Sequence, residues 1–413
     1  MPTPDNIQQN AISLVVEGKI HSAWSRYQID SDFLVPADAW SVTLGLPDGI
    51  FPSTIRRGVP VQVRVGSDVV MSGRIDTVQR RVSRQQVSIT ISGRDDSAVL
   101  VDCASPVFTS RQLSLEEVIA QVVRPLGIKN IQLRAESSIS NDKVSVEPGE
   151  RAWDTLERAA SARGLWPWFD PDGTLVIGGP DYTAEPVATL ILNRDGKGNN
   201  ILDITDRSSI TGCYSELTIL AQGHAQGSKS AKHGTEIIDV GDEAAAPPYA
   251  ADDSNSDDDN DILVSTGSPE TGFHGLRSVV RDVTVPYYRP QIMIVGDADN
   301  QAQSDYRARK AMADARLAGF DLTIIVKGHR TESGLLWQPG QRIRVRSEPH
   351  GTDDIYFLMG REFSGGRPDN TITTLRLKED GIWIPDAYPK KRKTRKRRAK
   401  VNKELEIIDV EPN

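Results

Sequence analysis

Pro339-Gly340-Gln341-Arg342-Ile343-Arg344-Val345-Arg346 is a turn followed by strict apolar/polar alternation, and it opens a stretch, Trp337 to Gly381, that occurs twice in the chain. Alternation with a period of two residues is typical of a β-strand with one buried face. The stretch continues with Ile355 to Met359, which ends in Gly360-Arg361, and closes with the alternating segment Thr371 to Glu379.

The earlier copy runs from Arg57 to Gly93, with Gly58 before its first strand and Gly73-Arg74 at the end of its second. Both copies read glycine, alternating strand, strand ending in Gly-Arg, polar turn and alternating strand. The first and second glycines are 15 residues apart in one copy and 20 in the other. The difference predicts a longer hairpin loop at Glu348 to Asp354. We interpret the repeat as one small β-module used twice.

Length and composition predict a soluble protein of several domains. A chain of 413 residues is expected to hold two to four domains, each large enough for a core. Its apolar runs are too short to cross a bilayer, and its first residues lack the blocks of a signal peptide. The two cysteines, Cys103 and Cys213, suit a reducing compartment and predict neither a disulfide framework nor a metal site.

Charge divides the chain into an acidic body and a basic tail. Nine of the eleven residues from 390 to 400 are basic, and removing them from the net charge of −8 leaves the body near −17. An acidic body argues against a duplex-DNA reader. The tail is a candidate protein-contact segment or a solvated segment, with phosphate binding as the less favoured alternative. Its basic residues are Lys390, Lys391, Arg392, Lys393, Arg395, Lys396, Arg397, Arg398 and Lys400.

Four regions follow from the local patterns. Residues 1–105 hold short strands such as Ile12 to Val16 and are expected to form a first antiparallel β-barrel. Residues 106–185 are expected to form a small α+β domain. Residues 186–385 are expected to form the second barrel, and residues 386–413 form the basic tail. The predicted fold class is therefore mixed β and α+β, with two similar small antiparallel β-barrels plus a small α+β domain.

The α+β domain is predicted from two helices and a hairpin. Ser114 and Glu117 form a capping box at the start of the first helix. The second helix is expected over Ala152 to Arg163, and Asp170-Pro171-Asp172-Gly173 supplies the hairpin turn.

The second barrel is expected to begin with Leu190 to Leu192 and Ile210 to Ala221 and to carry two additions. Residues 223–272 are rich in Gly, Ala, Ser and Asp, which predicts a mobile acidic loop. A helix is expected over residues 299–318. Its predicted buried stripe is Ala308, Ala311, Met312, Ala315 and Ala318.

The patterns predict no catalytic, cofactor or metal site. An EF-hand reading that begins at Asp253 fails because Asp258 stands where glycine is needed and Val264 where the closing glutamate is needed. The six histidines show no paired-ligand spacing, and no GxSxG, P-loop or dinucleotide motif is present. Adjacent carboxylates, Asp95-Asp96 and Asp353-Asp354, are expected to point apart into solvent.

The second module, from Gly334-Leu335-Leu336-Trp337 onward, resembles the baseplate hub proteins of contractile-tailed phages. The likeness is to the Mu-type tail protein P family, and more distantly to the P2-type tail protein D and the hub of T-even phages. Further matching segments are Gly73-Arg74-Ile75-Asp76, Ser92-Gly93-Arg94-Asp95 and Asp305-Tyr306-Arg307-Ala308-Arg309. The resemblance covers roughly residues 10 to 385 and leaves out the acidic loop and the basic tail.

The resemblance implies a structural hub rather than an enzyme. It implies a homotrimer whose doubled barrels form a pseudo-six-fold ring, adapting a six-fold tail tube to a three-fold spike around an axial channel. The implied partners are the tail tube or tube-initiating protein above, the spike below and neighbouring baseplate proteins. Genome DNA would pass only in transit, with no membrane insertion and no cofactor. The implied location is the virion, after assembly in the host cytoplasm.

Two other classes stay open at this point. One is a tail-associated cell-wall hydrolase, although no identifiable muramidase motif or metal site supports it. The other is a carbohydrate- or nucleic-acid-binding barrel module. A peptidoglycan-degradation assay tests the first, and duplex-DNA binding that survives deletion of residues 390–400 tests the second.

Overall fold

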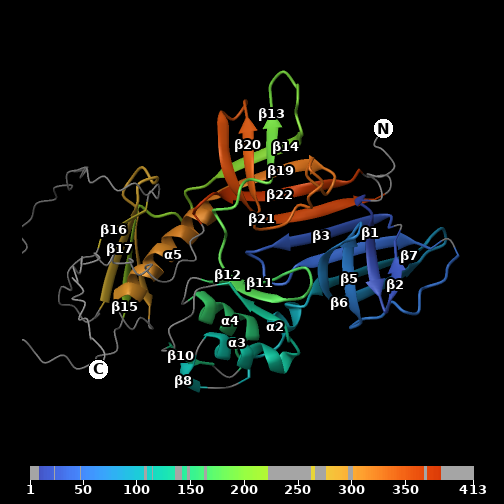
Figure 1. Ribbon diagram of the computed structural model, residues 1–413, viewed down its shortest axis with the longest axis horizontal. Coiled ribbons are helices and arrows are strands. Elements are labelled where there is room, and N and C mark those ends of the chain that lie inside the picture. Colours follow the sequence, from blue (N-terminus) through green and yellow to red (C-terminus); the bar gives the residue numbers. More distant parts are fainter. Residues whose placement is uncertain are drawn as a thin grey trace, which may run out of the picture.

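The computed structural model describes residues 9–22, 24–46, 48–106, 109–113, 115–134, 142–146, 149–161, 165–221, 262–265, 276–295, 301–366 and 370–382. Ser114, most of the predicted acidic loop and the whole basic tail lie outside these residues. Within them, no helix is both long and apolar enough to span a membrane. The structure is rich in β-strands, and it divides into several packed units (Figure 1).

The first module consists of strands in which buried and less buried residues alternate, as in Ile12–Val16 and Pro60–Val65. Its strands are β1 (Ile12–Val16), β2 (Lys19–His21), β3 (Arg26–Asp32), β4 (Ala39–Gly45), β5 (Pro60–Val65), β6 (Asp68–Val82) and β7 (Val87–Asp95).

The α+β domain follows directly and packs its helices around Leu100, Ile119, Trp153 and Leu156. Its elements are α2 (Ala98–Asp102), β8 (Thr109–Leu113), α3 (Leu115–Val123), the 3-10 turn η1 (Arg124–Leu126), β9 (Ile131–Leu133), β10 (Asp142–Ser145), α4 (Ala152–Ser161), β11 (Trp166–Phe169) and β12 (Leu175–Gly178). The predicted hairpin turn is confirmed, since β11 and β12 pair across it. The second predicted helix is confirmed as α4 over Ala152–Ser161.

The second module repeats the strand order of the first. Its strands are β13 (Ala188–Leu192), β14 (Ile201–Ser208), β19 (Phe320–Lys327), β20 (Arg342–Ser347), β21 (Thr352–Gly366) and β22 (Ile372–Glu379). The pairing order is β3-β4-β7-β6-β5-β1 in the first module and β14-β19-β22-β21-β20-β13 in the second, and the chain visits equivalent strands in the same sequence. One difference is that β1 runs antiparallel to β5, whereas β13 runs parallel to β20.

The repeat inferred from the sequence is therefore confirmed, but its loop is placed differently. The loop between β5 and β6 holds residues 66–67, and the loop between β20 and β21 holds residues 348–351. Residues 352–354, expected in the loop, belong to β21. The extra spacing of the second copy therefore comes partly from a longer loop and partly from a longer strand before Gly360.

Both modules belong to one 13-stranded sheet, because β3 of the first pairs with β21 of the second. The β-rich, multi-domain class is confirmed, yet no pairing between described strands closes either module into a barrel of its own. One apolar cluster runs through both modules and includes Leu14, Ile29 and Val63 from the first and Ile324 and Leu375 from the second. Figure 1 shows the two modules side by side, with the α+β domain below their junction.

A separate four-stranded sheet stands between β14 and β19 in the chain. It contains β15 (Glu216–Ala221), β16 (Ile262–Ser265), β17 (Leu276–Asp282) and β18 (Pro290–Val295), and α5 (Gln301–Gly319) packs on it. The expectation that 210–221 begins the second barrel is wrong, because β15 pairs with β17 and β18. Likewise, β16 lies within the range predicted to be a mobile loop.

The long helix α5 confirms the prediction for residues 299–318 within two residues at each end. Ala308 and Met312 of the expected stripe are buried against β15 and β17. Ala318 is exposed, because the helix presents Leu317 instead to Phe357 and Met359 of β21. The helix therefore connects the four-stranded sheet to the second module, as Figure 1 shows.

Candidate functional site: the junction between the two modules

The two modules meet along β3 and β21, and this junction is the candidate functional site. The antiparallel register runs from Asp32 opposite Gly360 to Arg26 opposite Gly366. The first half of β21 pairs with β20, and its second half pairs with β3. One module thus binds another by extending its sheet, which uses backbone hydrogen bonds as well as side chains.

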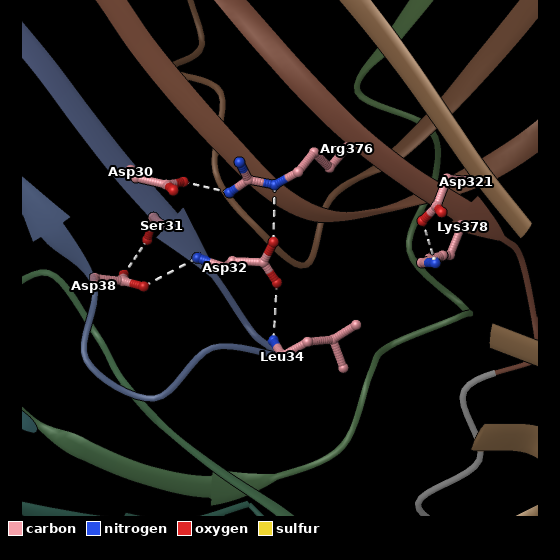
Figure 2. A network of polar contacts seen from close by, with 8 residues as sticks. All are labelled: Asp30, Ser31, Asp32, Leu34, Asp38, Asp321, Arg376 and Lys378. Atoms are coloured by element: carbon pink, nitrogen blue, oxygen red, sulfur yellow. Dashed lines mark hydrogen bonds and ion pairs between the residues drawn. The ribbon is translucent and has the colours of Figure 1, made fainter. Parts of the chain in front are cut away.

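An ion pair crosses this junction, and Figure 2 shows it from close by. Arg376 Nε donates to Asp32 at 2.8 Å, and Arg376 Nη2 donates to Asp30. Gly360 leaves the space for this contact, since a Cβ atom there would lie 2.9 Å from Arg376 Nε and closer still to the Asp32 carboxylate. Burial raises the pKa of Asp32, while the N–H of Leu34 and the charge of Arg376 oppose the rise. The glycine of the repeated Gly-Arg pair therefore makes room for an inter-module salt bridge.

The arginine of that pair, Arg361, is almost fully buried behind the junction. Its Nη1 donates to the carbonyl oxygen of Ile29 at 3.2 Å, and its guanidinium lies 4.0 Å from the centroid of the Phe363 ring. Burial lowers the pKa of Arg361 to about 10, and the charges of Asp38 and Asp30 act in the opposite direction. A buried charge is costly without its partners, so Arg361 favours the one register that keeps these carboxylates close.

Two carboxyls, the half-buried Asp38 and the buried Asp95, share a cavity of about 90 Å³ with Arg361, where both modules meet the α+β domain. Asp38 accepts hydrogen bonds from the hydroxyl of Ser31 and from the N–H of Asp32, the latter at 2.9 Å (Figure 2). Burial raises the pKa of Asp38 to about 6. Burial, followed by the negative charge of Asp38, raises the pKa of Asp95 well above its ordinary range. Both carboxyls therefore keep their protons to a higher pH than an ordinary aspartate does.

The expectation that both adjacent carboxylate pairs are solvated is wrong for Asp95. Its Oδ1 accepts from the N–H and hydroxyl of Ser97, where α2 begins, and this local turn draws the side chain inward. Asp353 follows the expectation: it is exposed and forms ion pairs with Arg344 and Arg346.

A buried histidine completes the junction on its other side. Thr373 donates its hydroxyl proton to the carbonyl of Gly328 at 2.5 Å, so it accepts from His329 Nδ1 at 3.1 Å. The remaining ring nitrogen, Nε2, then accepts from the Tyr27 hydroxyl at 2.9 Å. Burial, and then the charge of Arg361, lowers the pKa of His329 to about 3. Tyr27 lies on β3, so a neutral imidazole links the two modules.

A separate ion pair in Figure 2 joins β22, an interior strand of the second module, to the segment where α5 ends and β19 begins. Lys378 Nζ donates to Asp321 at 2.6 Å and to the carbonyl oxygens of Leu317 and Phe320 at 2.5 and 2.6 Å. These carbonyls stand where α5 ends, and a cation there satisfies acceptors that the helix leaves open. Lys378 therefore joins β22 to the end of α5.

The surfaces that meet at this junction occur a second time, and there they lack a partner among the described strands. In the strand order, β14 is equivalent to β3, and β6 is equivalent to β21. The second half of β21 is mostly buried, whereas residues 76–82 of β6 are mostly exposed, and so is β14. Val82 is 69% exposed and Leu202 is 59% exposed. Among the described strands, each chain therefore leaves two edges uncovered. One is the β3-like edge of β14, and the other is the β21-like edge of β6.

The predicted tail residues 390–400 lie outside the described residues, so the structure places none of them. Cys213 is buried and Cys103 is half-buried, and both are free. Among the described residues, no cluster of histidine, cysteine and carboxylate side chains is arranged to hold a metal ion.

Sequence reasoning missed the polar group at the junction. The repeated Gly-Arg pair was a signal for Gly360 and Arg361. Asp38 and His329 lie in segments without regular alternation, and nothing in their neighbours indicates burial.

Four regions of the chain match models of known protein families. Residues 11–95 match the Mu phage baseplate assembly protein GpP-like N-terminal domain, and residues 97–179 match the second domain of baseplate hub protein gp44-like proteins. Residues 266–312 match the third domain of tail protein NMB1110-like proteins, and residues 314–382 match a tail protein C-terminal domain.

Individual relatives agree with these matches. The tail protein from Neisseria meningitidis MC58 is 37% identical, has a TM-score of 0.73, and the match covers 92% of this chain and 99% of that one. The baseplate hub protein gp44 of Escherichia phage Mu is 22% identical over 85% of this chain and 83% of its own length. The 43 kDa tail protein of prophage MuSo2 from Shewanella oneidensis is 21% identical with a TM-score of 0.71, covering 92% of this chain and 99% of that one.

Proposed function

The chain belongs to the family of Mu-type phage baseplate hub and tail proteins, and from this we propose that it is the trimeric hub that adapts a six-fold tail tube to a three-fold spike. Proteins of this family are structural components of phage tails and baseplates. In the proposed assembly, three chains form a ring of six similar modules around an axial channel.

One observation carries the proposal: each chain contains one completed module junction and the two uncovered edges of a second. Within the chain, β3 extends the sheet at β21. β14 is equivalent to β3, and β6 is equivalent to β21. On the side where β3 and β21 pair with each other, β14 and β6 have no partner among the described strands. Because β3 pairs with β21 inside the chain, β14 of one chain would pair in the same way with β6 of the next chain. Such a head-to-tail contact generates a closed ring when its rotation closes.

The charges on the uncovered edges support the same pairing. At the completed junction, β3 contributes acidic residues to basic residues of the second module, as the Asp32–Arg376 pair illustrates. The uncovered β14 carries exposed Asp203 and Asp206 against one base, Arg207, and residues 76–82 of β6 carry exposed Arg80 and Arg81 against one acid, Asp76. On balance, acidic residues therefore lie on β3 and on its equivalent β14. Basic residues lie on the side of β21 and on its equivalent β6. Opposite charges of this kind favour the correct partner and register.

A doubled module accounts for the symmetry that a hub requires. Identical contacts cannot join a six-fold tube to a three-fold spike. Three chains with two similar modules each would offer six nearly equivalent faces to the tube or tube-initiating protein above. The units that occur once per chain would offer three-fold contacts to the spike and neighbouring baseplate proteins. Genome DNA would pass through the channel, and the acidic body would keep its phosphates from binding.

The division of the chain and the role of its tail also remain proposals. We keep boundaries near residues 105, 185 and 385, with the four-stranded sheet and α5 as a unit inserted within the second module. The basic residues from Lys390 to Lys400 would contact an acidic surface of a neighbouring tail protein. Assembly would take place in the host cytoplasm, before the hub enters the virion.

Charge reversal at the uncovered edges tests the ring. The unaltered protein should sediment as a trimer, and Asp203→Arg/Asp206→Arg should sediment mainly as a monomer because like charges then face Arg80 and Arg81. Combining it with Arg80→Asp/Arg81→Asp should restore the trimer.

The matched control is Asp154→Arg/Glu185→Arg, which makes the same charge change on exposed residues that lie on neither β6 nor β14. This control should remain trimeric. A parent protein that is monomeric at micromolar concentration would refute the assembly. A trimer that survives the reversal on β14 would refute this particular pairing.

We further propose that the hub acts without catalysis. Its relatives are named as tail and hub proteins rather than as hydrolases. Degradation of peptidoglycan by the purified protein would overturn this part of the proposal and favour a tail-associated hydrolase.

A further inference from the structure

The strand β18 presents an unusual amount of apolar surface for an edge strand. Ile292 is 62% exposed, Met293 is 41% exposed and Ile294 is 69% exposed. β18 pairs with β15 on one side and with no other described strand. An edge strand with open backbone groups and apolar side chains is a template for another strand, and natural proteins cover such edges. The feature thus indicates that a further segment binds here.

The two faces of β18 define what that segment must offer. The register with β15 places Met293 beside Ile219, on the face that α5 covers, and places Ile292 and Ile294 on the opposite face. A matching strand therefore needs an apolar side chain on each face at adjacent positions, because successive side chains of a strand point to opposite faces.

The charge at this edge favours an acidic segment. Arg289 directly precedes β18, and its Nη1 donates to the uncharged Tyr287 hydroxyl at 2.8 Å. Arg277 and Arg281 of β17 lie farther away, because β15 separates β17 from β18. An incoming strand with carboxylates beside its apolar residues would meet the charge of Arg289, whereas a basic strand would be repelled.

The chain itself contains such a sequence outside the described residues. Glu406-Ile407-Ile408-Asp409-Val410 has two consecutive isoleucines between carboxylates, and the same five residues occur at Glu236 to Val240. Consecutive isoleucines place one apolar side chain on each face of a strand. We infer that the C-terminal segment Glu406 to Val410 binds along the free edge of β18 in the same chain.

The C-terminal copy has the reach that this requires. The described chain ends at Ile382, which packs against Leu317 near the end of α5. The 19 residues of α5 span about 28 Å at a rise of about 1.5 Å per residue. The residues between 382 and 406 can extend over roughly 75 Å at about 3.3 Å each, so they can pass the length of the helix without strain.

Hydrogen exchange of the full-length protein tests this inference. The amides of β18 that face away from β15 should be protected in the parent. In Ile407→Asp/Ile408→Asp their exchange rate should rise at least tenfold, while β15 and β17 stay unchanged. Adding a synthetic peptide of residues 404–411 should restore the protection.

The internal copy supplies a matched control, since Ile237→Asp/Ile238→Asp makes the same change in the same five residues. This control should leave β18 protected. Equal exchange in both variants, a rise only in the control, or unprotected β18 amides in the parent would each overturn the inference. Protection that disappears on dilution would also overturn it, by assigning the edge to a second chain. Sedimentation of both variants reports the module ring separately, because neither substitution touches β6 or β14.

Discussion

Asp95→Asn should make the protein progressively more stable than its parent as the pH rises above about 4. The substitution removes a titrating group and keeps its hydrogen bonds, because an amide oxygen can still accept from the N–H and hydroxyl of Ser97. Asp95 is only 7% exposed. Burial, followed by the charge of Asp38, raises its pKa well above the ordinary range.

Proton linkage determines the sign and size of this effect. Above an ordinary carboxyl pKa of about 4, the unfolded chain releases the Asp95 proton while the folded chain retains it. The stability contributed by this group is therefore complete below about pH 4 and is lost as the pH rises to the folded pKa. The loss is about 1.4 kcal/mol per pH unit. The asparagine variant does not lose this stability, so its advantage over the parent should grow by up to about 1.4 kcal/mol per pH unit while the pH is below the folded pKa of Asp95.

Urea unfolding of both proteins at several pH values between 4.5 and 6 measures this difference. Protein concentration must be the same throughout, because assembly also stabilises the folded chain. Other titrating groups occur in both proteins, so they largely cancel. Asp353→Asn is the control: a hydrogen bond from Arg344 lowers the pKa of Asp353, so this carboxyl is ionised in both the folded and the unfolded chain over this range, and its difference from the parent should stay nearly constant. A difference between Asp95→Asn and its parent that stays constant with pH would refute the reasoning.

Two further substitutions test the junction, and a third tests the contact between β22 and α5. Gly360→Ala should lower the free energy of unfolding by about 2 kcal/mol, because the added methyl group enters the Asp32–Arg376 ion pair. His329→Gln should cost about 1–3 kcal/mol at pH 7 in urea unfolding, since buried polar groups lose their partners. That deficit should shrink as the pH falls below 6, because a pKa of about 3 makes the parent lose stability there. Lys378→Met should cost about 2 kcal/mol and speed amide exchange at the end of α5.

Matched variants separate these effects from general damage. Gly45→Ala should be nearly neutral, since the nearest atom to its new Cβ is Gln86 Nε2 at 3.8 Å. Lys327→Met changes an exposed lysine on the neighbouring strand β19 and should leave α5 unaffected. A Gly360→Ala variant as stable as its parent would mean that the Asp32–Arg376 ion pair does not require the space left by the missing Cβ atom of Gly360. A pH-independent deficit in His329→Gln would argue against a neutral buried imidazole.

The local elements of this protein were predictable from the sequence. The turn at Pro339-Gly340 and the alternation after it indicate a strand, because side chains of a strand point to opposite faces at every residue. The same signals at Gly58 revealed the repeat. The hairpin at Asp170 to Gly173 was predictable because turn residues act over a few positions. These signals depend on neighbours in the sequence and need no tertiary contact.

The choice of partners was decided only by the tertiary structure. Residues 216–221 look like any other strand, and nothing local indicates that they pair with β17 and β18 rather than with the second module. The cavity beside Asp95 likewise includes Asp38 and Arg361, which come from other elements of the fold.

The sequence by itself determined that one β-module is used twice, because its alternation and its Gly-Arg pair are local and repeat in order. Only the tertiary structure decided that the two copies share one sheet through β3 and β21, whose partners Ile29 and Arg361 are 332 residues apart. Strand edges are chemically alike, since every edge offers the same backbone donors and acceptors. Which edges meet depends on ion pairs, glycine clearances and buried charges that exist only once the chain has folded.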